Sequence, residues 1–390
     1  MDPKKQVAFL SRGAAELLTP SELEAKLHKG KPLRVKAGFD PTIADLHLGH
    51  TVVMQKLKQF EELGHQVIFL IGDATARVGD PSGQSKTRPT LSAKEIEQNA
   101  KTYLDQAFKI LDKKKTEVRR NSEWFKKMNA MEIVDLAGHY NVARMLERED
   151  FKKRYTEGGQ VTIQEFIYPL MQGYDSVVLK ADVELGGSDQ KFNLAVARDI
   201  QRAHAQDPEV ILTMPLLVGT DGVKKMSKSY GNYIGITEPP KEIFGKLMAL
   251  SDEMMWHYYE LLTDEDLSAA KKMHPKEAKI ALAKAIVTRY HSAKEAEAAA
   301  EEFEKVFGQK GKPGEIEEKV LSRKAPLGSL VQVIVQTGLV PSKSEARRLI
   351  EQGGVTVDDQ KIQDIHAQIT TTSDHLIKVG KRRFLRVRFE

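Results

Sequence analysis

The stretch LRVKAGFDPTIADLHLGHTVVMQKLKQFEELGHQVIFLI, Leu33–Ile71, contains one complete unit of supersecondary structure. Its first seven residues predict a strand, and Val67–Ile71 is an unbroken apolar run typical of a buried strand. Between them, apolar residues recur at helical spacing in Val53–Leu63, and Gly64 is placed to end the helix. A strand, a helix and a strand of this length form a βαβ unit, which implies a parallel sheet.

Further strand and helix signals follow in the first half of the chain. Val183–Leu185 predicts a short strand, Gly186–Gln190 (GGSDQ) opens a helix, and Val210–Val218 predicts a later strand. Together these elements predict an α/β fold with a doubly wound, Rossmann-like parallel sheet. Ligands of such sheets bind at the carboxyl ends of the strands.

The composition is that of an ordinary globular protein. The 390 residues suggest two or three domains, and 41% are hydrophobic and 29% charged. Because cysteine is absent, disulfides, thiolate metal sites and cysteine nucleophiles are excluded. No stretch approaches 18 apolar residues and the N-terminus is unlike a signal peptide, so we expect a cytoplasmic protein without a membrane segment.

The charge is distributed unevenly along the chain. The formal net charge is +5, and Leu321–Glu390 alone holds 12 Lys/Arg against 7 Asp/Glu. The whole basic excess therefore lies in the last part of the chain. A basic end on a neutral body predicts an appendage that binds a polyanion, although a solvated tail has the same composition.

We expect three domains. A catalytic Rossmann-like domain is predicted for 1–234, with a helical insertion at about 120–160, and helix-rich sequence predicts an α-helical domain over 235–320. A small α+β domain is predicted for 325–390. In this last domain Ser342 and Glu345 have the spacing of a helix cap, and FLRVRF alternates like a strand.

DLHLGH, Asp45–His50, lies where the helix of the first βαβ unit begins. The N–H groups at a helix N-terminus favour a phosphate, and Gly49 would let a flat base approach the main chain. His47 and His50 are three residues apart and would donate to one phosphate, stabilising charge that develops at an α-phosphorus. A helix-capping role is an open alternative. A metal site is the weaker alternative, because no further ligands occur at metal spacing.

A second phosphate signal is KKMSKS, Lys224–Ser229, in a glycine-containing stretch after the strand predicted to end near Val218. Lys225 and Lys228 on a mobile loop would hold the β- and γ-phosphates of a nucleotide while pyrophosphate leaves. A lysine-rich loop that is simply solvated is the alternative.

Together, HxGH at the first βα turn and KMSKS after a late strand resemble the paired signature of class I aminoacyl-tRNA synthetases. Over essentially its full length the chain resembles the bacterial tyrosyl-tRNA synthetases. The matching stretches are GFDPTIADLHLGH, GDPSG, YPLMQGYDS, GGSDQ and KMSKS. The resemblance implies activation of L-tyrosine with ATP to tyrosyl-adenylate and pyrophosphate, followed by transfer to the 3′ end of tRNA(Tyr). It implies ATP as a substrate with Mg²⁺, no permanently bound cofactor, and no metal on the protein.

Tyr168, Gln172 and Asp175 recur at positions i, i+4 and i+7, so they share one face of a helix and are able to line a small polar pocket. A polar rim on an ordinary amphipathic helix is the alternative. The resemblance implies that Tyr168 and Gln172 hold the amino group of tyrosine and that Asp175 accepts a hydrogen bond from its phenol. A buried acceptor of this kind disfavours phenylalanine, which would leave it unpaired.

The resemblance also implies the remaining contacts. ATP would be bound at Asp40, Gly49, Arg88, Gly187, Asp189, Met226, Ser227 and Ser229, with Asp189 accepting from a ribose hydroxyl. Asp80 and Gln190 would join the tyrosine site. One position departs from the better-known branch of the family, where a tyrosine that also contacts the phenol stands two residues before the glycine of GFDP. Here that residue is Lys36, and together with KMSKS this resembles the second bacterial branch.

The resemblance makes 235–320 the anticodon-side domain, and 325–390 resembles a small RNA-binding module shared with a ribosomal small-subunit protein. Its candidate contacts to tRNA phosphates are Lys343, Arg347, Arg348, Lys381, Arg382, Arg383, Arg386 and Arg388. The family implies a homodimer with an interface near Trp124–Tyr155. The alternatives are a tryptophan-activating enzyme, a cytidylyl-type nucleotidyltransferase, and a non-catalytic RNA-binding paralogue.

Overall fold

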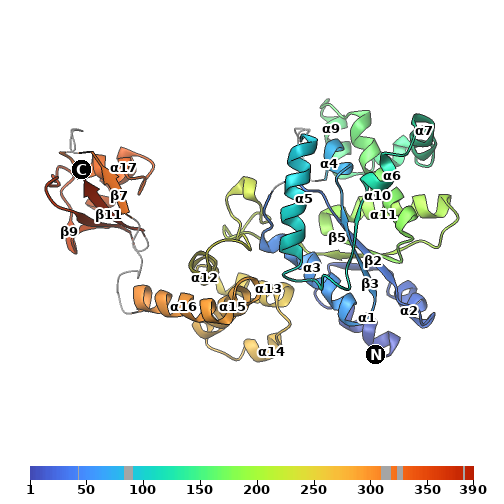
Figure 1. Cartoon of the computed structure of the whole chain (residues 1–390), viewed down its shortest axis with the longest axis horizontal. Coiled ribbons are helices and arrows are strands. Elements are labelled where there is room, and N and C mark those ends of the chain that lie inside the picture. The colour runs from blue at the N-terminus through green and yellow to red at the C-terminus, as the bar shows by residue number, and fades with distance from the viewer. Residues whose placement is uncertain (43, 83–90, 309–317, 323–327, 381–382) are drawn as a thin grey trace. The chain divides into compact units, whose positions relative to one another are not determined.

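The computed structural model describes residues 1–42, 44–82, 91–308, 318–322, 328–380 and 383–390 (Figure 1). The chain divides into two compact units, unit 1 (Met1–Ala300) and unit 2 (Glu301–Glu390). Within the described ranges, none of the helices combines the length and the apolar character needed to cross a membrane.

A mixed six-stranded sheet forms the centre of unit 1. Its strands are β1 (Glu16–Leu18), β2 (Arg34–Phe39), β3 (Gln66–Ile71), β4 (Glu117–Arg120), β5 (Val183–Gly187) and β6 (Val210–Met214). Their order is β1-β6-β5-β2-β3-β4 (Figure 1). All neighbours from β6 to β4 are parallel, which confirms the predicted parallel sheet.

Two features of this sheet differ from the sequence prediction. The edge strand β1 is antiparallel to β6 and was not predicted, because three residues are too few to show a strand period. The predicted strand Val210–Val218 is too long. β6 ends at Met214 because Pro215 has no N–H to donate to the next step of the ladder.

The strand order places the ligand site. From β2 the chain adds β3 and β4 on one side, and it then returns to add β5 and β6 on the other side. The order therefore reverses between β2 and β5, and the carboxyl ends of strands at such a reversal are where α/β sheets bind ligands. Lys36 on β2 and Glu184 on β5 are paired in register at this reversal.

Helices connect and cover these strands. Those outside the insertion are α1 (Pro3–Ser11), α2 (Pro20–His28), α3 (Leu48–Glu62), α4 (Thr75–Val78), α5 (Ala93–Ala107), α10 (Ile163–Leu179) and α11 (Lys191–Ala203). α3 joins β2 to β3 as predicted, and Gly64 follows its end with a φ of 87°, a left-handed conformation that suits glycine. α10 and α11 pack against each other, α10 contacts β2, and α11 contacts β5 and β6.

Four short helices lie between β4 and α10. They are α6 (Ser122–Phe125), α7 (Ala130–Gly138), α8 (Val142–Met145) and α9 (Glu149–Thr156). Leu136 and Met145 from this segment pack in one apolar cluster with Leu170 of α10. The insertion is thereby attached to the helix that carries the predicted tyrosine pocket.

The remainder of unit 1 is helical. Its helices are α12 (Pro240–Met248), α13 (Asp252–Leu262), α14 (Leu267–Ala270), α15 (Pro275–Tyr290) and the first part of α16 (Ala293–Phe303). α13 contacts α3, and the Tyr258 hydroxyl donates to the main-chain oxygen of Val218 at 2.7 Å. This helical part therefore supports the loop that follows β6.

Unit 2 is a small α+β unit. It contains the helical turn η3 (Glu304–Gly308), β7 (Glu318–Leu321), α17 (Leu330–Gln336), α18 (Lys343–Glu351), β8 (Val355–Val357), β9 (Gln360–Ile362), β10 (His375–Val379) and β11 (Arg383–Phe389). The five strands form one sheet in the order β7-β11-β10-β8-β9. β11 alternates between buried and exposed residues, and Ser342 caps α18 by accepting from Glu345 N–H at 3.2 Å. Both local predictions are confirmed.

Candidate active site

The two histidines of DLHLGH lie at the beginning of α3, next to the carboxyl end of β2. His47 is the N-cap residue, and its Nδ1 accepts from Gly49 N–H at 3.2 Å. The Nδ1 of His50 accepts from His47 N–H, also at 3.2 Å, and the two ring centroids are 3.9 Å apart. Because both Nδ1 atoms accept, each neutral ring carries its hydrogen on Nε2. The capping and phosphate-donating interpretations are therefore compatible.

Both imidazoles are neutral at pH 7. Burial, followed by His50 and the charge of Lys228, lowers the pKa of His47 to about 2. Burial, with a smaller effect of Lys228, lowers the pKa of His50 to about 4. Neutral rings donate hydrogen bonds without adding positive charge. The positive charge that a triphosphate requires must therefore come from other side chains.

The absence of a side chain at Gly49 leaves space for the His47 ring as well as for a ligand. A Cβ at Gly49 would lie 3.0 Å from both Cε1 and Nδ1 of the His47 ring and 3.6 Å from the Cβ of Met226. A side chain here would push the ring out of its capping position. Gly49 therefore allows the imidazole, the KMSKS stretch and the helix N-terminus to come together.

The KMSKS stretch is tied to the protein by main-chain bonds. Met226 is buried, and its N–H donates to Leu217 O at 2.7 Å. Ser227 caps the short helix η2 (Lys228–Tyr230) by accepting from Ser229 N–H at 3.3 Å, and its own N–H donates to Asn232 Oδ1 at 2.8 Å. These bonds hold the lysine-bearing segment close to Gly49.

Each KMSKS lysine is paired with a carboxylate. Lys225 Nζ lies 3.0 Å from Asp189 Oδ2, and Lys228 Nζ lies 2.8 Å from Asp45 Oδ2. The lysine side chains are 35% and 25% exposed, so these pairs are partly solvated. Such pairs contribute only about 0–1 kcal/mol to stability, and a phosphate is able to replace the carboxylate.

Asp189 is close to the main chain that precedes it. A Cβ at Gly187 would lie 2.6 Å from Asp189 Oδ1, which excludes any larger residue at Gly187 without a shift of that carboxylate. The predicted ribose acceptor is therefore fixed at the carboxyl end of β5. Its other carboxylate oxygen accepts from Lys225 Nζ at 3.0 Å.

A second group of side chains lies on α10 and the end of β2. The Tyr168 hydroxyl donates to Asp40 Oδ2 at 2.9 Å, and Asp40 Oδ1 accepts from the Thr75 hydroxyl at 2.7 Å. Gln190 Nε2 donates to Asp80 Oδ2 at 2.8 Å. Burial, followed by the charges of Asp40 and Asp80, raises the pKa of Tyr168 well above its usual value, which keeps its hydroxyl a donor.

Asp175 is the deepest acceptor on α10 and is 2% exposed. Its Oδ1 accepts from Trp124 Nε1 at 3.0 Å, and its Oδ2 accepts from Asn121 Nδ2 at 3.4 Å. Burial raises the pKa of Asp175 to about 7, although Lys36 and these two donors favour the ionised form. A carboxylate oxygen is able to accept more than one hydrogen bond. Both oxygens of Asp175 are therefore able to accept a further bond from a ligand.

Both the side chain and the main chain of Gln172 are hydrogen-bonded to charged residues of the sheet. Its Nε2 donates to Glu184 Oε1 at 3.0 Å, and its main-chain oxygen accepts from Lys36 Nζ at 3.1 Å. Lys36 and Glu184 form an ion pair with 3.2 Å between Nζ and Oε1. The side chain of Lys36 thus ends at α10 and β5.

Some of the remaining predicted contacts lie within the described residues and others lie outside them. Arg88, Lys381 and Arg382 lie outside the described residues. Lys343, Arg347 and Arg348 are exposed on α18. Arg386 and Arg388 lie within 3.4 Å and 3.7 Å of the Glu318 carboxylate, and Arg383 donates to Leu339 O at 2.6 Å.

Several residues at the site were not predicted from the sequence. They are Asp45, Thr75, Asn121, Trp124 and Glu184. Asp45 adjoins the histidine motif, so its position alone was a usable signal. Trp124 entered the sequence analysis only as one end of the expected interface region. Its indole is buried and donates to Asp175, and the interface stays a prediction. Among the residues that the structure describes, no three His, Asp or Glu side chains are grouped to hold a metal ion.

Comparison with known proteins identifies the families that the chain matches. The family of class I tRNA synthetases (W and Y) matches residues 28–308, and the S4 domain matches residues 329–374. The tyrosine–tRNA ligase of Aquifex aeolicus is 51% identical over 391 residues, 99% of each chain. That of Bordetella avium is 53% identical over 388 residues, covering 96% of this chain and 94% of the relative.

Solved structures show the same fold. The C-terminally truncated mitochondrial tyrosyl-tRNA synthetase of Aspergillus nidulans has a TM-score of 0.65 at 22% identity, covering 78% of this chain and 94% of that chain. The Archaeoglobus fulgidus enzyme has a TM-score of 0.63 at 24% identity, covering 77% and 100%. The chain belongs to the class I tRNA synthetases, in the group that contains the tryptophan and tyrosine enzymes. Within that group it is a member of the tyrosine–tRNA ligases, a family of aminoacyl-tRNA synthetases.

Proposed function

We propose that this chain activates L-tyrosine with ATP, bound with Mg²⁺, and transfers the tyrosyl group to tRNA(Tyr). The observation that supports it best is the buried Asp175 at one end of a site whose other end carries His47, His50, Lys225 and Lys228. A buried carboxylate is suited to a phenol, and neutral imidazoles with two lysines are suited to a triphosphate. The site therefore contains a recognition end and a reaction end.

In the first step, a carboxylate oxygen of tyrosine attacks the α-phosphorus of ATP. A new oxygen–phosphorus bond forms, the bond from the α-phosphorus to the bridging oxygen breaks, and pyrophosphate leaves with the bond electrons. The Nε2–H groups of His47 and His50 donate to oxygens of the α-phosphate as negative charge develops there. Gly49 keeps the main chain free of a side chain at this place.

Lys225 and Lys228 balance the charge of the departing pyrophosphate. Each ammonium is paired with a carboxylate, Lys225 with Asp189 and Lys228 with Asp45, so both positive charges lie at the site. When ATP binds, phosphate oxygens replace these carboxylates on the lysines. Release of Asp189 then frees the carboxylate to accept from the ribose hydroxyl.

In the second step, a terminal hydroxyl of the tRNA attacks the tyrosyl carbonyl carbon and forms the new ester bond. The bond from that carbon to the phosphate oxygen of the mixed anhydride breaks, AMP leaves with its electrons, and the hydroxyl proton is released to solvent. Mg²⁺ neutralises phosphate charge and enters with ATP. Exposed Lys343, Arg347 and Arg348 on α18 contact tRNA phosphates. Such contacts add affinity that falls with salt and carry little base specificity.

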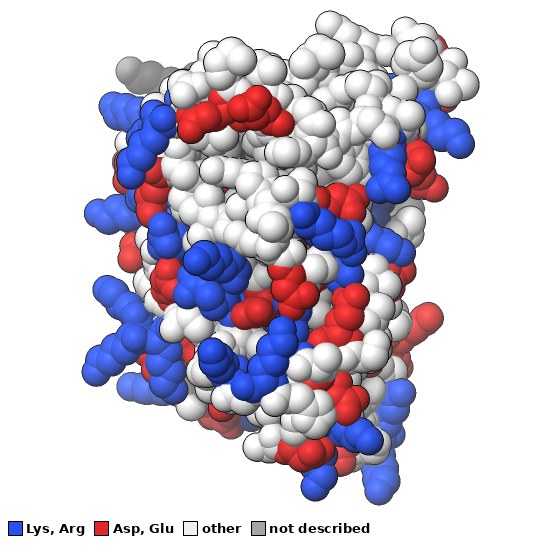
Figure 2. Space-filling view, turned by 90° about the vertical axis from the view of Figure 1, so that its right-hand side faces the viewer, with Lys and Arg blue, Asp and Glu red and all other residues white. Residues whose placement is uncertain are grey.

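The enzyme acts as a homodimer, with the interface on the insertion beyond Trp124. Large apolar side chains are exposed there at Met131, Val134, Val142 and Tyr155, between 57% and 67%. Figure 2 shows charged residues of both signs crowded over the lower part of this face of the molecule, whereas the upper part is mainly uncharged, apart from an acidic patch and basic residues near its edges. An apolar surface with fewer charges favours association with a second protein surface.

Amino-acid-dependent ATP–pyrophosphate exchange tests the function. Purified protein should exchange pyrophosphate into ATP in the presence of tyrosine. The kcat/KM of exchange with tryptophan or phenylalanine should be at least about a hundredfold lower than with tyrosine. Charging of a tRNA(Tyr) transcript with labelled tyrosine tests the second step. Folded protein that exchanges with tryptophan and not with tyrosine would overturn the proposal.

A further inference from the structure

The reversal of strand order holds a buried ion pair beneath the tyrosine end of the site. Lys36 and Glu184 are register partners on β2 and β5 and are 0% and 1% exposed. Removing two charges from water offsets much of their attraction, and an apolar pair of similar volume is often equally stable. Stability alone therefore does not account for this pair.

The pair is bonded to α10 on both sides of Asp175. Lys36 donates to the main-chain oxygen of Gln172, and Glu184 accepts from the Gln172 side chain at Oε1. Glu184 Oε2 also accepts from the Ser176 hydroxyl at 3.3 Å. Gln172 lies three residues before Asp175 and Ser176 directly follows it, so the pair fixes the turn of helix that carries the carboxyl.

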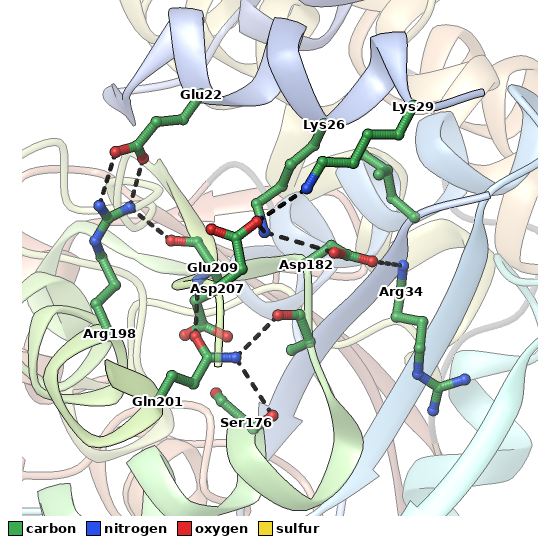
Figure 3. A network of polar contacts seen from close by, with 12 residues as sticks. Glu22, Lys26, Lys29, Arg34, Ser176, Asp182, Arg198, Gln201, Asp207 and Glu209 are labelled. Carbon is green, nitrogen blue, oxygen red and sulfur yellow. Dashed lines mark hydrogen bonds and ion pairs between the residues drawn. The ribbon is translucent and has the colours of Figure 1, made fainter. Parts of the chain in front are cut away.

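A third carboxyl completes the buried cluster. The main chain of Glu209 is fixed by Arg198, which donates to its oxygen at 2.6 Å, and by Gln201, which accepts from its N–H at 2.7 Å (Figure 3). Burial, followed by the neighbouring Glu184, raises the pKa of Glu209 well above its usual value. Glu209 therefore holds its proton more tightly than an exposed glutamate, which limits the negative charge that it adds beside Glu184.

Lys36 also acts on Asp175 through its charge. Burial is the largest influence on the Asp175 pKa and raises it, and Lys36 is the largest influence that lowers it. The negative charge of Glu184 raises it by less than Lys36 lowers it. The ammonium itself stays protonated, because the attraction of Glu184, Glu209 and Asp175 outweighs its own burial and raises its pKa.

Among the residues that the structure describes, the groups that bond Asp175 from the other elements add no second cation. Trp124 and Asn121, on and next to α6, offer neutral N–H donors. On its own helix the facing titratable group is Tyr168, whose pKa is raised well above its usual value by burial first, and then by Asp40 and Asp80 with a smaller effect of Asp175. Lys36 is therefore the cation on which the charge state of Asp175 depends within the described part of the site.

We propose that Lys36 is a positioning and specificity-determining residue for tyrosine, which fixes α10 at Gln172 and keeps Asp175 in the form that accepts the phenol hydrogen. This inference rests on the proposed function, in which Asp175 reads the phenol. In this proposal Lys36 acts through Gln172 and Asp175 and does not itself contact the substrate. An ionised Asp175 accepts a hydrogen bond from the tyrosine phenol, and phenylalanine offers no donor to replace that bond. A protonated Asp175 distinguishes the two amino acids less well.

The test uses the full-length enzyme and compares Lys36→Met with the double variant Lys36→Met/Glu184→Gln. The double variant leaves no buried unpaired carboxylate at Glu184 and retains an amide there to bond Gln172 and Ser176. In both variants we expect the preference for tyrosine over phenylalanine, measured as kcat/KM in ATP–pyrophosphate exchange, to fall roughly tenfold or more. The loss should lie mainly in the KM for tyrosine. The acidic limb of the kcat/KM profile for tyrosine should move to higher pH.

Lys26→Met is the matched control. Lys26 is a buried lysine of unit 1 whose Nζ lies 3.5 Å from Asp182 and 3.6 Å from Asp207 (Figure 3). Asp182 precedes the first residue of β5, whereas the ligand site is expected at the carboxyl end of that strand. This variant should lose stability while keeping the tyrosine preference and the pH limb of the wild type. A melting curve for each variant separates folding from recognition.

The outcomes separate the two proposals. Absence of tyrosine-dependent exchange in the wild type would overturn the proposed function itself. A wild type that prefers tyrosine, together with a folded double variant that keeps both its preference and its pH limb, would show that Lys36 is only structural. If Lys36→Met fails to fold, the double variant decides. If both fail to fold, an unchanged preference and pH limb in Lys36→Arg, which keeps the cation, supports the proposal, and a lost preference contradicts it.

Discussion

The two ends of the active site hold their lysines in opposite ways. At the tyrosine end, Lys36 is paired with Glu184 and neither side chain is more than 1% exposed. At the nucleotide end, Lys225 and Lys228 are paired with carboxylates but remain 35% and 25% exposed. Water and incoming phosphates reach the second kind of pair and not the first.

The difference in exposure separates recognition from reaction. A buried pair cannot exchange partners at low energetic cost, so it keeps the tyrosine end in one arrangement before substrate arrives. A partly solvated pair exchanges partners readily, so it supplies positive charge to a ligand that appears only during turnover. The amino acid therefore meets a fixed environment and the triphosphate meets a movable one.

The largest expected effect is on stability. Lys36→Met leaves a buried carboxylate without its cation, and the free energy of unfolding should fall by about 3–5 kcal/mol. Lys228→Met breaks a solvated pair and should change it by at most about 1 kcal/mol. Urea denaturation of the two variants measures both values. Equal losses would contradict the difference in exposure on which the comparison depends.

Removing the donor at His47 should cost roughly 10²–10³-fold in kcat for tyrosine activation, because a neutral N–H no longer reaches the α-phosphate. His47→Asn retains an oxygen that is able to cap α3, whereas His47→Ala removes both roles. Pre-steady-state formation of tyrosyl-adenylate measures the rate. Thermal melting should show a loss of about 1 kcal/mol for the alanine variant only. If His47→Ala were slow and His47→Asn fully active, the role of His47 would be to cap α3.

Replacing the phenol acceptor should have a more specific effect. Asp175→Ala should lose roughly 10- to 150-fold of the preference for tyrosine over phenylalanine, since a hydrogen bond to a charged group contributes about 1.5–3 kcal/mol. Exchange kinetics with each amino acid at saturating ATP measure this preference. The KM for ATP should change little, and an equal loss for ATP would mean that the two ends are not separate.

The smallest effect is expected in unit 2. Arg347→Ala/Arg348→Ala should leave pyrophosphate exchange unchanged and weaken tRNA binding, reducing the slope of log affinity against log salt by about 2. Filter binding of tRNA across a salt series gives the slope. Lys4→Ala/Lys5→Ala removes two exposed basic residues of unit 1 as a control and should leave that slope unchanged. The same reduction in both variants would indicate a general charge effect.

The sequence predicted the elements with a strong local pattern. The βαβ unit from Leu33 to Ile71 and the alternation of β11 both follow periodicities of a few residues, and both are present. The three-residue β1 had no such pattern, and Pro215 ended β6 earlier than the apolar run indicated. Local rules thus located the strands better than their ends.

The residues of the site also divide into those with a local sequence pattern and those without one. The histidine and lysine motifs are each contiguous in the sequence, so the sequence alone identified them. The partners of Asp175 were not, because Trp124 and Asn121 are more than fifty residues away along the chain and contact it only through the fold. Lys36 was noticed as a departure from the family pattern, but its partner Glu184 lies on another strand and has no sequence signal.

Calorimetric titration of the free enzyme with L-tyrosine, without ATP and at several pH values, tests the central claim most directly. A fixed tyrosine end predicts that tyrosine binds without ATP. Because burial raises the pKa of Asp175 to about 7 and the phenol donates to its ionised form, the affinity should fall as the pH drops below that value, approaching about tenfold per unit. Tyrosine binding that requires ATP, or an affinity that is constant from pH 8 to about pH 5.5, would contradict it.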